Sequence, residues 1–124
     1  MKTLTLYPFI PSGKNYDTAL SFFKALGFKK DWGDDQLCGL SMGGAYFLLQ
    51  NIENQEWQQN QMVVIEVDDL DSFWEMLLSK NLETDFPGVR MKKPAEYPWG
   101  REIHIIDPAG VCWHIRAGTN RQQP

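Results

Sequence analysis

The sequence predicts an α+β fold in which two βαβββ modules form a curved open barrel with a cleft. The first reason is that 124 residues, of which 43% are hydrophobic, can fill one packed core but not two. The second is a repeated order of strand, helix and three strands over about residues 1–50 and 61–117. Two repeats are too few for a solenoid, so we expect a single domain over residues 1–124 whose sheets enclose a cleft.

The first module begins with a β-rich segment from Thr3 to Ile10, in which Pro8 has no N–H for a ladder hydrogen bond. A helix capped by Asn15 and Gly27 is expected next, because apolar residues recur at helical spacing: Tyr16, Ala19, Leu20, Phe22, Phe23 and Leu26. Two turn sequences then separate three strands, which we expect over residues 28–32, 36–42 and 45–50.

The second module follows a polar stretch, residues 51–60, that we interpret as a linker. Its elements are predicted in this order: a strand over 61–67, a helix capped by Asp68 or Asp69 with an apolar stripe from Leu70 to Leu78, a proline-broken segment over 82–97, and strands over 101–106 and 111–117. Asp107-Pro108-Ala109-Gly110 is a turn sequence between the last two strands. Trp113 is expected in the core, under the second helix.

Charge and cysteine content exclude several classes of partner. A net charge of -4 leaves no basic surface for nucleic acid, and it fits either a cationic ligand or an ordinary solubilising surface. Cys38 and Cys112 are far apart and outside any metal-binding spacing, which is typical of buried thiols in a reducing compartment. The sequence has no signal-peptide pattern and no apolar run of membrane-spanning length. We therefore expect a cytoplasmic protein with no nucleic-acid or membrane partner.

The most specific stretch is Pro98-Trp99-Gly100-Arg101-Glu102, followed by the Asp107–Gly110 turn and then by Cys112 and His114. It resembles the signature of the bleomycin resistance proteins, which belong with glyoxalase I and the extradiol dioxygenases to the vicinal oxygen chelate superfamily. The resemblance covers nearly the whole chain and implies the paired-module fold. It also implies a non-catalytic protein that binds and sequesters an antibiotic or a similar small molecule.

Catalytic members of that superfamily hold a divalent ion at four positions. Here those positions fall near Pro8, Leu48 to Gln50, Met62 and His114, and only His114 is a credible ligand. A small shift in alignment could admit Gln50, Gln61 or Glu66, although carboxamides are weak ligands. The sequence therefore predicts no metal, no cofactor and no catalytic residue. The alternative is a metal-dependent enzyme of the glyoxalase or dioxygenase type. His114 is either a hydrogen-bonded core residue or a ligand contact, and His104 is interpreted as structural.

Ligand-binding residues are predicted from the aromatic side chains and from the resemblance. Trp32, Trp57 and Trp99 lie at strand ends or in loops, where an indole can stack on a flat or cationic ligand. The resemblance places Leu37 where a second stacking Phe is expected, and Val64 and Glu66 where two tryptophans are expected. Glu66 either pairs with a cationic ligand or is a solvated charge. The candidate set is Trp32, Leu37, Gln50, Trp57, Met62, Val64, Glu66, Trp99 and His114.

The terminal strand also predicts an assembly. Pro8 and Pro11 stiffen this segment and remove hydrogen-bond donors, which favours its extension towards a partner over internal pairing. Bleomycin resistance proteins are dimers that exchange an N-terminal arm, so the resemblance points the same way. We expect a homodimer with arm exchange, in which both chains build each cleft.

Overall fold

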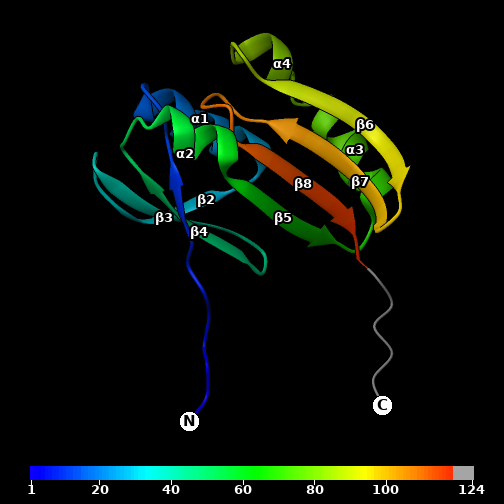
Figure 1. The fold of residues 1–124 in the computed structure, drawn as a ribbon, viewed down its shortest axis with the longest axis horizontal. Helices are drawn as coiled ribbons and strands as arrows, with labels where there is room; N and C mark the ends of the chain where they lie inside the picture. The colour runs from blue at the N-terminus through cyan, green and yellow to red at the C-terminus, as the bar shows by residue number, and fades with distance from the viewer. Residues whose placement is uncertain (119–124) are drawn as a thin grey trace.

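The computed structural model describes residues 1–118, which form two four-stranded sheets of mixed strand direction (Figure 1). The first sheet has the order β1-β4-β3-β2, with β1 (Phe9–Pro11), β2 (Lys29–Gly33), β3 (Leu37–Met42) and β4 (Ala45–Gln50). The second has the order β5-β8-β7-β6, with β5 (Met62–Val67), β6 (Arg90–Tyr97), β7 (Gly100–Ile106) and β8 (Cys112–Ala117). In each module the first strand pairs in parallel with the last.

The predicted fold class of two βαβββ modules with open sheets is thus confirmed. The last residues of the expected domain, 119–124, lie outside the described residues. Within residues 1–118, no helix is long and apolar enough to cross a membrane.

The two long helices begin at side-chain caps that the sequence predicts. The Asn15 side chain accepts a hydrogen bond from the Thr18 N–H at 3.0 Å and starts α1 (Tyr16–Leu26), which ends at Gly27 with a φ of 131°. Asp69, and not Asp68, caps α3 (Leu70–Leu78). The apolar faces of both helices pack on the sheets and close the core.

The prediction of a strand from Thr3 to Ile10 is wrong for most of that segment. Only Phe9–Pro11 forms β1, and the chain before it extends away from both sheets (Figure 1). Leu4 and Leu6 are 89% and 78% exposed. Pro8, immediately before β1, has no N–H to donate to a ladder, and β1 begins directly after it.

The stretch expected to be a linker contains α2 (Gln55–Asn60), so that interpretation is also corrected. The Asn54 side chain caps this helix, and the amide of the buried Gln58 donates to the Ala109 carbonyl at 2.9 Å. Polar contacts hold α2 in place of an apolar stripe, which explains why hydrophobic periodicity does not reveal it.

The proline-broken segment contains α4 (Leu82–Asp85) and the eight-residue strand β6. The pairing of β6 with β7 shifts register between Lys92 and Ala95, on either side of Pro94. Pro94 is tolerated because β6 is an edge strand and a bulge needs no donor at that residue.

Trp113 joins the two modules in the core. Its ring contacts those of Phe23, Phe28 and Phe47 at centroid distances of 5.2, 6.3 and 5.2 Å. These aromatic partners belong to the first module and not to α3, under which Trp113 was expected. The Trp113 Nε1–H donates to Asp107 Oδ2 at 2.9 Å, and Asp107 Oδ1 accepts from the Ala109 and Val111 N–H groups. Asp107 therefore fixes the β7–β8 turn against the core.

Candidate functional site

Each sheet has one face in the core and one open face, because successive side chains of a strand point to opposite sides. Leu40 and Leu49 of the first sheet are buried, as are Ile103 and Ile115 of the second. Most candidate residues alternate with such core residues along their strands. The structure therefore divides them between the open faces of the two sheets.

The open face of the first sheet is largely apolar. Leu37 and Gln50 are cross-strand partners on β3 and β4, and Trp32 is paired with Gly39 on the next strand. The Trp32 side chain is 49% exposed, and Phe9 and Tyr46 are further exposed aromatics of this sheet. This face offers aromatic surface for stacking.

The open face of the second sheet combines apolar and charged side chains. Met62, Val64 and Glu66 alternate along β5, and their parallel partners on β8 are Cys112, His114 and Arg116 respectively. The three β5 residues are exposed, whereas Ile65 between them is buried. His114 therefore lies on the same face as the predicted ligand contacts of β5.

Glu102 is the centre of a hydrogen-bond network that the candidate set lacked. Its carboxylate is 1% exposed, and its Oε1 accepts from His104 Nε2 at 2.9 Å and from His114 Nδ1 at 3.0 Å. Its Oε2 accepts from Trp99 Nε1 at 2.8 Å and from Arg116 Nε at 2.6 Å. One buried carboxylate thus holds four side chains of the open face in place.

The surroundings of Glu102 also set its charge. Burial alone would raise the pKa of this carboxyl, but the hydrogen bonds from His104, His114, Arg116 and Trp99 outweigh burial and lower the pKa from 4.5 to about 2. Glu102 is therefore ionised at neutral pH. Because an ionised carboxylate only accepts hydrogen bonds, both imidazoles must present an N–H to it.

The exposed Trp99 and the half-buried Tyr97 form an aromatic pair at the β6–β7 turn. The Trp99 indole stacks on the Tyr97 ring, with centroids 5.3 Å apart and an interplanar angle of 11°. The indole is 54% exposed although its Nε1–H is bound to Glu102. A fixed ring with a free face is suited to stacking on a planar ligand.

Cys112 and His114 are neighbours on the open face, with 3.6 Å between Cys112 Sγ and His114 Nε2. Burial, followed by the charges of Glu102 and Asp107, raises the pKa of the Cys112 thiol. The thiol stays protonated at neutral pH, so the pair lacks the thiolate that nucleophilic catalysis needs.

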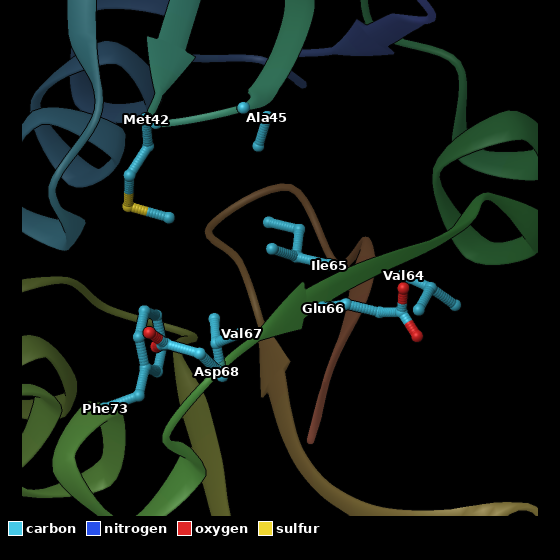
Figure 2. A pocket seen from close by; sticks show the side chains of 10 residues that line it. Met42, Ala45, Val64, Ile65, Glu66, Val67, Asp68 and Phe73 are labelled. Carbon is cyan, nitrogen blue, oxygen red and sulfur yellow. The ribbon is translucent and has the colours of Figure 1, made fainter. Parts of the chain in front are cut away.

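A cavity of about 670 Å³ lies between the β3–β4 hairpin and the end of β5 (Figure 2). The side chains that face it are mainly apolar: Met42, Ala45, Ile65, Val67 and Phe73. Val64 and Glu66 border this cavity, but their side chains point away from the hairpin (Figure 2). The cavity therefore separates the modules without bringing the candidate residues of the two sheets together.

Trp57 lies apart from the other candidates. It is on α2, outside both sheets, and its Nε1–H donates to Gln61 Oε1 at 2.7 Å. Its half-buried indole thus contacts the C-cap residue of its own helix, a structural role that the sequence does not reveal.

Comparison with solved structures places this geometry in a family. The fold matches that of the bleomycin-binding protein from bleomycin-producing Streptomyces verticillus complexed with copper(II)-bleomycin, with a TM-score of 0.80 and 30% identity over 96% of this chain and 99% of that one. The chain belongs to the bleomycin resistance protein family. Searches of protein-family models and of curated proteins found no match.

Two further matches show the fold alone. A bleomycin resistance determinant encoded on the transposon Tn5 has a TM-score of 0.80 and 22% identity, and the match covers 94% of this chain and 98% of that one. The fosfomycin resistance protein FosX from Listeria monocytogenes, complexed with Mn(II) and sulfate ion, has a TM-score of 0.69 and 14% identity, with coverage of 97% and 94%. Proteins of different function thus share this architecture with the bleomycin resistance family.

The residues at the superfamily's four metal positions do not fit a catalytic metal centre here. Pro8, Leu48 and Met62 offer no nitrogen or oxygen side-chain donor, and the Gln50 carboxamide is a weak one. His114 is the remaining donor, and its Nδ1 is bound to Glu102. One imidazole alone does not hold a catalytic ion.

Proposed function

We propose that this protein binds a bleomycin-type antibiotic without modifying it and so lowers the concentration of free drug. The observation that carries the proposal is the fixed, exposed Trp99 indole stacked on Tyr97, in a chain that is 30% identical to a bleomycin-binding protein complexed with copper(II)-bleomycin. A flat heteroaromatic group can stack on such a ring, and each desolvated contact of this kind contributes on the order of 0.5 to 2 kcal/mol.

The chemistry of the two open faces supports a ligand with a flat end and a cationic end. Trp32 and Leu37 on the first sheet supply apolar contact, and Gln50 a polar one. On the second sheet, Met62 and Val64 supply apolar contact and Glu66 a carboxylate on the same side. His114 completes this set beside Val64.

The complete binding site is a cleft built from two copies of the chain. Leu4 and Leu6 precede a three-residue β1 and are 89% and 78% exposed in one chain. Exchange of residues 1–7 between two chains would cover these side chains and bring the first sheet of one chain towards the second sheet of its partner. Trp32 and Trp99 would then flank one ligand from different chains.

The enzyme alternative predicts a different fate for the drug. Protein in molar excess is mixed with metal-free bleomycin, and the drug retained with the protein is measured. The complex is then unfolded in denaturant, and the mass of the released drug is determined by mass spectrometry. Sequestration predicts drug that is retained with the protein before denaturation and has an unchanged mass afterwards. A changed mass would support catalysis instead of sequestration. Drug that is neither retained nor changed in mass would contradict both functions.

A further inference from the structure

Glu102, His104 and His114 bring three potential metal donors to one point on the open face of the second sheet. Their donor atoms all lie within 4.8 Å of one another, with Oε1 of Glu102 2.9 Å from His104 Nε2 and 3.0 Å from His114 Nδ1. Three donors that each lie about 2.0–2.2 Å from a tetrahedral ion are separated by about 3.4 Å. Small rotations of the two partly exposed imidazoles would produce that arrangement.

We propose that these three side chains form a binding site for a divalent transition-metal ion such as Zn²⁺. Two imidazoles and one carboxylate are a donor set that Zn²⁺ accepts, with water or an exogenous ligand in the open fourth position. The inference does not depend on antibiotic binding, and it uses none of the superfamily's metal positions except that of His114. The site lies within one hairpin, β7–β8, of one chain.

The atoms of these three side chains that would not bind the ion contact neighbouring residues. Arg116 and Trp99 bind Oε2 of Glu102, so Oε1 is the atom left for an ion. The Tyr97 hydroxyl lies 3.5 Å from Nδ1 of His104, and Cys112 Sγ lies 3.6 Å from Nε2 of His114. Such outer contacts fix the orientation of metal ligands.

These contacts also account for the two ring protons. When an ion takes Nε2 of His104, the ring proton moves to Nδ1, where the Tyr97 oxygen can accept it in a hydrogen bond. When the ion takes Nδ1 of His114, the proton moves to Nε2, beside the sulfur of Cys112. Both imidazoles stay neutral, as metal ligation requires.

The test is a Zn²⁺ titration of the metal-stripped full-length protein against a chromophoric chelator, together with the visible spectrum of the Co²⁺ complex. We expect one ion per chain and cobalt bands of a nitrogen and oxygen site without a thiolate charge-transfer band. His104→Gln and His114→Gln each keep an amide donor for Glu102. Each should lower the affinity for Zn²⁺ by at least the roughly 10- to 100-fold that is typical of a lost outer contact. Glu56→Gln, which removes an exposed carboxylate of α2 outside both sheets, is the matched control and should keep wild-type affinity.

Three results would overturn the site: no saturable binding of either ion, unchanged affinity in His104→Gln, or a thiolate band that disappears in Cys112→Ala. Thermal unfolding of each variant shows whether it is folded. If a histidine variant does not fold, the wild-type stoichiometry and cobalt spectrum decide the question alone.

Discussion

The indole of Trp32 lies directly on the backbone of Gly39, its partner on the neighbouring strand. A Cβ atom at Gly39 would be 2.4 Å from Trp32 Nε1 and 2.6 Å from Cε2. The absence of a side chain at Gly39 therefore lets the indole lie flat on the open face of the first sheet.

Gly39→Ala should displace the Trp32 indole without unfolding the protein, because the atoms that collide belong to a half-exposed side chain. If Trp32 stacks on the drug, affinity should fall by roughly 5- to 30-fold, which corresponds to about 1–2 kcal/mol. Gly44→Ala is the matched control, since a Cβ there meets nothing within 4 Å. Calorimetric titration with bleomycin and urea unfolding measure both effects, and equal affinities of the two variants would remove Trp32 from the site.

Asp107→Ala should destabilise the fold strongly. It removes the acceptor of the buried Trp113 Nε1–H and of two backbone N–H groups in the β7–β8 turn. Buried donors without partners cost about 1–3 kcal/mol each, so we expect a loss of about 2–5 kcal/mol in the free energy of unfolding. Asp34→Ala is the control: Asp34 accepts from Gln36 and Leu37 in the same way but is exposed. Chemical denaturation that gives similar losses for both variants would contradict the role of burial.

Glu102 gives the stability of the fold a defined acid dependence. Because its pKa is lowered from 4.5 to about 2 in the folded state, the stabilisation by its charge is complete above pH 4.5 and is lost as the pH falls towards 2. The difference corresponds to about 3 kcal/mol. We expect the stability advantage of the wild type over Glu102→Gln to shrink across this range in urea unfolding. A stability advantage that stays constant or grows on acidification would contradict this prediction.

Deletion of residues 1–7 should convert the proposed homodimer to a monomer. The deleted arm carries Leu4 and Leu6, which are exposed in one chain and which a second chain could cover. Analytical ultracentrifugation of the full-length and shortened proteins at micromolar concentration checks this. Leu4→Ser with Leu6→Ser is the matched variant that keeps the chain length. A full-length monomer would contradict the assembly, and a shortened dimer would contradict only the arm exchange.

Much of the fold follows from local signals in the sequence. Asn15, Gly27 and Asp69 are helix caps at the expected positions, and hydrophobic periodicity locates both long helices. The short helix α2 is missed because polar contacts of Asn54 and Gln58 hold it, and β6 is obscured by Pro94 because tolerance of proline depends on its place at a sheet edge.

The candidate site is only half visible in the sequence. The alternation of β5 correctly places Met62, Val64 and Glu66 on one face, but the role of Glu102 depends on pairing across the β7–β8 turn. Glu102 pairs with Arg116 and His104 with His114, so the residue numbers of each pair have the same sum. The length of the Asp107–Gly110 turn sets this register, and the sequence does not fix that length. The sequence alone therefore does not predict which β7 residues lie opposite His114 and Arg116.

Tryptophan fluorescence during a titration with bleomycin tests the proposed function most directly. Both the copper-bound and the metal-free drug are used, so that quenching by copper alone is recognised. We expect saturable quenching by both forms and a roughly 5- to 30-fold weaker affinity for Trp99→Ala, which loses one stacking surface. The absence of saturable quenching up to high micromolar drug would contradict the proposed function.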